Sequence, residues 1–123
     1  IKKKIDFLFY YRNHKNKKTF FPVDLLKRLV KQNYKINIVG DKLKLKGIKN
    51  LGYVSYDQVN TLLNKTKFTV ISNENIFSFF TIDAINNNVK ILINEKYYNQ
   101  LRHYKKKFIK FNFCKNDLKK IKF

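Results

Sequence analysis

Two polar segments of this sequence carry residues that could bind a phosphate group. The first, residues 11–18, contains one arginine, one histidine and three lysines. The second, residues 72–78, reads Ser-Asn-Glu-Asn-Ile-Phe-Ser and precedes a stretch with helical spacing. A helix N-terminus offers free N–H groups and the positive end of the helix dipole, both of which favour an anion. If the two segments lie side by side, they could therefore hold a diphosphate from two sides.

Other common catalytic arrangements are missing from the sequence. It contains no GxGxxG and no GxxxxGK[ST] motif, which excludes the usual dinucleotide fingerprint and the P-loop. The single cysteine, Cys114, and the two histidines, His14 and His103, do not have the spacing of a zinc site. We find no paired carboxylates of the glycosidase kind and no Ser-His-Asp arrangement. No metal and no cofactor are therefore expected, and Cys114 is expected to be a small, half-buried apolar residue.

Apolar runs that alternate with amphipathic stretches should position the two polar segments. The runs have the length of buried strands, and they cover residues 5–11, 36–39, 48–54, 68–71, 89–93 and 108–113. Helices are expected between them, one capped by Thr19 with Pro22 in its first turn, one capped by Ser55, and one over residues 78–87. Strands alternating with helices indicate βαβ units with right-handed crossovers. We therefore predict an α/β fold, a doubly wound Rossmann-like parallel sheet of five or six strands with helices on both faces, in a single domain spanning residues 1–123.

Three segments are harder to assign. Residues 42–49 alternate lysine with leucine or glycine, which fits an exposed connection or an edge strand. Residues 94–107 are polar and aromatic without a clear period, and residues 102–107 mix aromatics with cations, as nucleic-acid and membrane-surface patches do. For that basic run a solvated strand edge is the simpler interpretation. Asn116 or Asp117 could cap a last short helix.

The predicted topology brings the two polar segments to the same edge of the sheet. In doubly wound sheets, ligands bind outside the carboxyl ends of the strands, near the point where the strand order reverses. Residues 11–18 follow the first predicted strand and residues 72–78 follow the fourth. We therefore expect a cleft between these two segments.

At this point the sequence resembles a family, the C-terminal half of retaining GT-B glycosyltransferases, which includes sucrose-phosphate and glycogen synthases. The resemblance covers residues 5–93 and rests on the order and spacing of several short motifs. They are Arg12 and Lys17 with four residues between them, Gly40-Asp41 after a strand, Leu51-Gly52-Tyr53-Val54-Ser55, Leu62-Leu63, the segment 72–78 leading to Asp83-Ala84, and the strand at Asn88-Val89-Lys90-Ile91-Leu92. The resemblance implies a domain that binds a nucleotide-sugar, the donor substrate.

By this resemblance, Arg12 and Lys17 would grip the donor diphosphate, and the backbone of Ile76, Phe77 and Ser78 would face a phosphate. Two fixed cations would offset the charge that grows on the leaving diphosphate, which gives them a catalytic role. The alternative is that both cations are ordinary solvated loop residues of a lysine-rich protein. Phe77 would more simply anchor the core.

Three further residues would meet the rest of the donor. Asp83 would accept hydrogen bonds from the ribose hydroxyls, or be an ordinary polar residue on a helix. Glu74 or Asn75 would contact the sugar hydroxyls, although Asn75 and Ser78 could also serve as helix N-caps. The sequence departs from the family pattern here, because Asn75 and Asp83 stand where two glutamates are expected and Ser78 replaces a glycine. A degenerate domain with a structural role is therefore an alternative function.

The net charge of +20 gives a further alternative, a basic module that binds nucleic acid or an anionic membrane surface. The charge comes from 25 lysines and only 3 arginines, whereas specific nucleic-acid reading depends most on arginine, so no specific nucleic-acid partner is expected. The expected partners are a nucleotide-sugar donor and a sugar or lipid acceptor, as in cell-envelope polysaccharide synthesis. The chain does not begin with Met, so we expect it to be cut from a longer protein whose N-terminal domain supplies the acceptor site. The expected location is the cytoplasm, with peripheral membrane contact left open.

Overall fold

The computed structural model describes residues 3–12, 23–70, 78–112 and 121. The strands are β1 (Ile5–Tyr11), β2 (Ile36–Gly40), β3 (Lys49–Gly52), β4 (Thr66–Val70), β5 (Lys90–Asn94) and β6 (Phe108–Phe111). They form a parallel sheet in the order β3-β2-β1-β4-β5-β6. The helices are α1 (Val23–Lys31), α2 (Tyr56–Asn64), α3 (Phe79–Asn86) and the 3₁₀ helix η1 (Glu95–Lys107). The predicted α/β class with a doubly wound sheet is confirmed.

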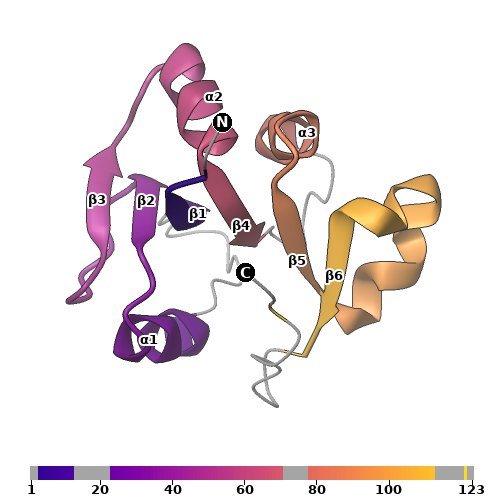
Figure 1. Ribbon diagram of the computed structural model, residues 1–123, viewed down its shortest axis with the longest axis horizontal. Helices are drawn as coiled ribbons and strands as arrows, with labels where there is room; N and C mark the ends of the chain where they lie inside the picture. Colours follow the sequence, from indigo (N-terminus) through magenta and orange to yellow (C-terminus); the bar gives the residue numbers. More distant parts are fainter. Residues whose placement is uncertain (1–2, 13–22, 71–77, 113–120, 122–123) are drawn as a thin grey trace.

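Helices cover both faces of the sheet, as predicted. Figure 1 shows α1 on one side and α2 and α3 on the other. Successive side chains of a strand point to opposite faces, and β1 supplies both layers. Phe7 and Phe9 pack in one core with Leu26 of α1, whereas Leu8 packs in the other with Leu63 of α2. Fully burying one such side chain stabilises the fold by about 1.5–3 kcal/mol, which is why the apolar run Phe7-Leu8-Phe9 lies in a central strand.

Two serines start the helices on the second face. The Ser55 hydroxyl accepts a hydrogen bond from the Gln58 N–H at 3.2 Å, and the Ser55 N–H donates to the Gln58 side chain at 2.9 Å. This capping box satisfies two N–H groups at the start of α2. The Ser78 hydroxyl accepts from the Thr81 N–H at 3.3 Å at the start of α3. Both predicted helix starts are confirmed.

Some predicted boundaries were wrong. The strand predicted over residues 48–54 is shorter, and the strand predicted over 68–71 begins earlier, at Thr66. Of the segment 42–49, residues 42–48 form a connection whose Leu43, Leu45 and Ile48 side chains are half-buried against the core, and Lys49 begins the edge strand β3.

The basic run at residues 102–107 is not a strand edge, because it belongs to η1. The Asn94 side chain caps this helix by accepting from the Lys96 N–H at 3.1 Å. Tyr98 and Leu101, three residues apart, both pack against the sheet, and this spacing matches the three residues per turn of a 3₁₀ helix. The predicted caps at Thr19 and Asn116 or Asp117, Pro22, His14 and Cys114 lie outside the described residues.

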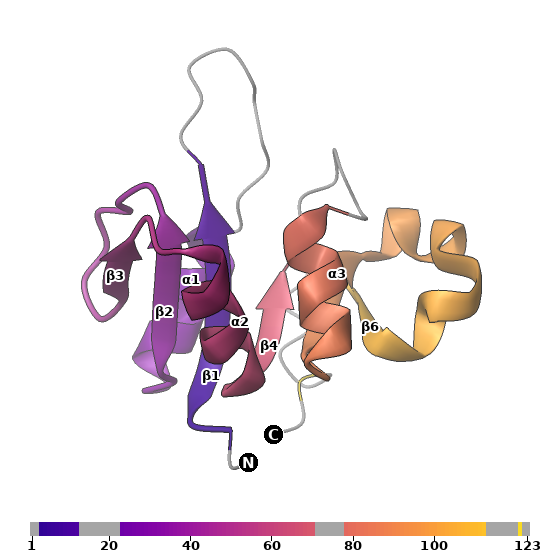
Figure 2. The ribbon, with the colours of Figure 1, turned by 90° about the horizontal axis from the view of Figure 1, so that it is seen from above.

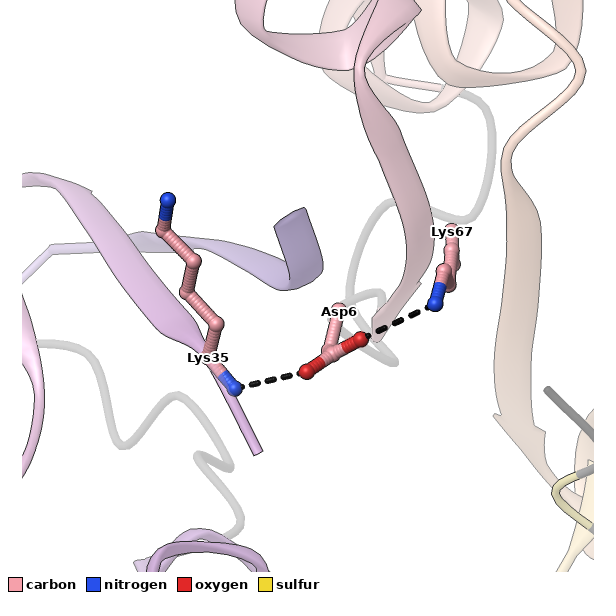
Figure 3. Close-up of polar contacts among 3 residues, drawn as sticks. All are labelled: Asp6, Lys35 and Lys67. Atoms are coloured by element: carbon pink, nitrogen blue, oxygen red, sulfur yellow. Dashed lines mark hydrogen bonds and ion pairs between the residues drawn. The ribbon is translucent and has the colours of Figure 1, made fainter. Parts of the chain in front are cut away.

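The amino ends of the central strands are tied together by Asp6 of β1. Its carboxylate accepts the Lys35 backbone N–H at 2.7 Å and pairs with Lys67 Nζ at 3.2 Å (Figure 3). Lys35 precedes β2 and Lys67 lies in β4, so one side chain joins β1 to both of its neighbours. Nearby, Lys3 Nζ donates to the carbonyls of Asn64, Thr66 and Asn87, at 3.3, 2.8 and 3.1 Å. These polar groups at the amino edge are therefore used for structure.

Candidate functional site at the carboxyl edge

The strand order reverses between β1 and β4. From β1 the chain continues to β2 and β3 on one side, and β4, β5 and β6 follow on the other. Figure 2 shows the carboxyl ends of β1, β2 and β4 pointing to one side of the molecule, where α3 also begins. In sheets of this kind the reversal point opens a crevice for ligands at the carboxyl edge. The residues that follow the strands at this edge are therefore the candidates for binding.

Three polar side chains follow β1, β2 and β3 and lie together. Arg12 comes directly after β1 and is exposed, Asp41 follows β2, and Tyr53 follows β3. The Tyr53 hydroxyl donates a hydrogen bond to Asp41 Oδ1 at 2.6 Å. Arg12 directly follows Tyr11, whose carbonyl accepts the Asp41 N–H at 2.8 Å, and the Arg12 side chain acts to lower the pKa of the Tyr53 hydroxyl. The three side chains thus form one polar cluster, which we call the Arg12 cluster.

The charged groups of the Arg12 cluster change the pKa of the Tyr53 hydroxyl. The hydrogen bond to Asp41 raises the pKa of Tyr53 above its ordinary value of 10.0, and the Arg12 side chain opposes this shift. Donating its proton to the Asp41 carboxylate favours the neutral phenol, because ionisation would break this hydrogen bond and place a second negative charge beside the carboxylate. Tyr53 therefore remains a hydrogen-bond donor to Asp41 throughout the neutral range.

Gly40 allows Asp41 to reach this position. Gly40 has a φ of +100°, and a Cβ at this residue would lie 2.3 Å from the carbonyl oxygen of Tyr11. The Asp41 N–H donates to that same carbonyl at 2.8 Å. A residue with a side chain would collide with the end of β1, so glycine permits β2 to finish directly against it. The Gly-Asp pair after a predicted strand is the sequence signal for this arrangement.

The first turn of α3 lies next to the end of β1 on its other side. The rings of Tyr10 in β1 and Phe80 in α3 are 5.7 Å apart. Ser78 caps the helix, and Phe79 is 85% exposed. The N-terminus of α3, with its positive dipole end, therefore borders the carboxyl end of β1.

Asp83 lies deeper, between two helices. It is 8% exposed, and its Oδ1 accepts a hydrogen bond from the Tyr56 hydroxyl at 3.0 Å. Tyr56 opens α2 and Asp83 lies in α3, so the bond joins these neighbouring helices. The predicted contact of Asp83 with a ribose stays a prediction.

The structure therefore brings Arg12 and Ser78 to the same edge, as the topology predicts. The other predicted site residues lie outside the described residues, and they are Lys17, Glu74, Asn75, Ile76 and Phe77. The predicted cleft between residues 12–18 and 72–78 is therefore not described either. Sequence reasoning assigned no contact to Asp41 and Tyr53, although both directly follow strands whose carboxyl ends meet. That position was the signal that could have identified them.

One hollow elsewhere in the described chain does not suit an anion. A hollow of about 390 Å³ lies between β3 and α2, and its lining is Leu51, Val54, Asp57, Gln58, Thr61 and Leu62. The charged member of this lining is an aspartate, which would repel phosphate. Within residues 3–12, 23–70, 78–112 and 121, no three His, Cys, Asp or Glu side chains are grouped as a metal site. In the same residues, every helix is too short or too polar to cross a membrane.

Comparison with known proteins identifies the fold class. No protein-family model matches the sequence, and no curated protein matches it. Among solved structures, the chain is similar to E. coli heptosyltransferase WaaC with ADP, with a TM-score of 0.55 and 12% sequence identity. The match covers 72% of this chain and 32% of that chain, so this chain spans about a third of the length of that enzyme. The similarity therefore shows that this chain shares a Rossmann-like fold with part of that enzyme.

Proposed function

We propose that this chain is the nucleotide-sugar-binding part of a glycosyltransferase. The observation that carries the proposal is the arrangement at the reversal point between β1 and β4. The exposed Arg12 follows β1, and the N-terminus of α3 borders the same strand end. A guanidinium and a helix N-terminus both attract phosphate oxygens, so a nucleoside diphosphate is the ligand that suits this edge.

The chemistry of this edge suits departure of a diphosphate. When a sugar is transferred, negative charge grows on the leaving diphosphate, and a fixed cation lowers the barrier by offsetting that charge. Arg12 can donate two parallel N–H bonds to a phosphate. Lys17 is proposed as the second cation. The acceptor, a sugar or a lipid, would bind to another domain of the same protein.

The similarity to WaaC supports this proposal. That heptosyltransferase is a transferase of sugars, and its structure holds ADP, a nucleoside diphosphate. The similarity in fold does not extend to the sequence, at 12% identity. The residues proposed for binding therefore rest on their own positions in this chain.

The test is a calorimetric titration of the chain with ADP, UDP and GDP at moderate salt. Arg12→Ala should weaken binding of the preferred nucleotide by about 10- to 150-fold, the range for a hydrogen bond to a charged group. Lys106→Ala is the matched control, because Lys106 is exposed on η1 and its loss removes the same charge from the total of +20. Equal effects of the two substitutions would show a diffuse polycation and refute the proposal.

The second candidate function is a degenerate domain of the same fold with a structural role. The contact of Asp83 with Tyr56 favours it, because the acid proposed for the ribose is engaged in joining α2 to α3. Under this alternative none of the three nucleotides binds. Under the first proposal at least one does, and Arg12→Ala weakens it.

A further inference from the structure

Arg12 is exposed, and a free arginine side chain samples many rotamers. Holding it in one geometry costs side-chain entropy. A binding site that uses this side chain gains affinity when other groups restrict it beforehand. The structure offers such a restriction in the Arg12 cluster.

The support for Arg12 is built from three strand ends. Tyr11, the residue before Arg12, pairs in register with Gly40, and its carbonyl accepts the Asp41 N–H at 2.8 Å. Asp41 is thereby fixed to the end of β1 through the main chain. Its carboxylate then holds the Tyr53 hydroxyl at 2.6 Å.

Because the Tyr53 hydroxyl donates to Asp41, its oxygen can still accept a hydrogen bond from Arg12. A phenol has one proton to donate and lone pairs that accept. Since the proton of Tyr53 points to Asp41, the lone pairs of the oxygen remain for an N–H of the nearby guanidinium. Arginine carries five N–H donors, so a bond to Tyr53 leaves others for two phosphate oxygens.

We propose that Tyr53, held by Asp41, is a positioning residue that orients the Arg12 guanidinium toward a diphosphate at the carboxyl edge of the sheet. This inference rests on the proposed function. Tyr53 acts through Arg12 and not on the ligand. Its removal therefore matters only while Arg12 is present.

The experiment is a double-mutant cycle on the full chain, with ADP and UDP as the probes. Tyr53→Phe should weaken binding about three- to tenfold, the range for loss of one hydrogen bond. In the Arg12→Gln background the same substitution should have no further effect. Asp41→Ala should reproduce the loss, and it should add nothing to Tyr53→Phe. Tyr97→Phe is the control. It also removes one tyrosine hydroxyl, but Tyr97 lies on η1, which connects β5 to β6 at the opposite end of the sheet from β3.

A merely structural role of Tyr53 gives a different pattern. Tyr53→Phe would then lower the urea midpoint and weaken binding equally with and without Arg12. We expect only a slight fall in the midpoint, because the side chain is 66% exposed and the ring is retained, so the comparison with and without Arg12 distinguishes the two roles. Additive losses, unchanged affinity or tighter binding of Tyr53→Phe would each overturn this inference.

The failure of the proposed function looks different. If Arg12→Gln binds as well as the wild type, or if the wild type binds neither probe, the proposed function fails and this inference fails with it. If Arg12→Gln weakens binding while Tyr53→Phe does not, only the positioning role is refuted.

Discussion

Replacing Gly40 by alanine should both destabilise the fold and damage the Arg12 cluster. A residue other than glycine with positive φ costs about 1–2 kcal/mol, and Gly40 has a φ of +100°. The added Cβ would also lie 2.3 Å from the Tyr11 carbonyl oxygen. Real Cβ atoms do not approach that closely, so β2 must move away from β1. We expect a total loss on the order of 3 kcal/mol, in the range of other backbone-strain and overpacking substitutions.

Gly52→Ala is the matched control for this substitution. Gly52 also has a positive φ, +74°, but a Cβ there meets nothing within 4 Å. It should therefore show the backbone strain alone, about 1–2 kcal/mol. Both substitutions reduce the entropy of the unfolded chain to the same degree, so this effect cancels in the comparison.

The assay is urea unfolding of the wild type and both variants, followed by circular dichroism. A domain of this size has a total stability on the order of 5–15 kcal/mol, so the difference between the variants is measurable. Gly40→Ala should also weaken nucleotide binding, because Asp41 follows it directly. If Gly40→Ala is no more destabilising than Gly52→Ala, the close contact with Tyr11 does not constrain the end of β2 and the reasoning is refuted.

Three further predictions concern single side chains. Asn37 is 5% exposed and its Oδ1 has no hydrogen-bond partner among the described residues, so Asn37→Val should raise the urea-unfolding free energy by about 1 kcal/mol; a loss would show that the amide is satisfied. Ser55→Ala removes the cap of α2 and should cost about 1 kcal/mol in the same assay, whereas an unchanged midpoint would count against the capping box. Tyr53 should ionise above pH 10.0, the ordinary value, in the ultraviolet difference titration against Tyr53→Phe, and Asp41→Asn should lower that midpoint. Because the folded pKa of Tyr53 is raised, the stabilisation of the fold by this bond is complete below the unfolded pKa and is lost as the pH rises through the folded value. If Asp41→Asn left the ionisation midpoint of Tyr53 unshifted, that result would contradict the hydrogen bond.

The sequence by itself determined the elements whose signals are local. The predicted strand over residues 5–11 has the observed bounds of β1, Ile5–Tyr11, because a strand whose middle is buried on both faces is rich in consecutive apolar residues. Ser55 was predicted as a helix cap, and capping was the alternative interpretation for Ser78, because capping depends on residues three positions apart. The alternation of strands and helices then predicted the doubly wound parallel sheet, through the fixed hand of its crossovers.

Local sequence signals did not predict two elements whose formation depends on tertiary packing, the helix η1 and the start of β4. Residues 94–107 have no strong helical or strand period, and η1 forms because Tyr98 and Leu101 pack against the sheet. The start of β4 was missed because Thr66 is polar, although it is fully buried. Its hydroxyl is satisfied by the Leu62 carbonyl at 2.7 Å.

Only the tertiary structure decided which distant residues meet. Arg12, Asp41 and Tyr53 follow three different strands, and they converge because β1, β2 and β3 are adjacent and parallel. Hydrophobic periodicity determines which face of an element is buried, but it does not specify which strands pair. The engagement of Asp83 by Tyr56 has the same origin, because it depends on α2 and α3 lying side by side on one face of the sheet. The sequence therefore determined which residues follow the strands at the candidate site, and long-range packing determined which of them meet.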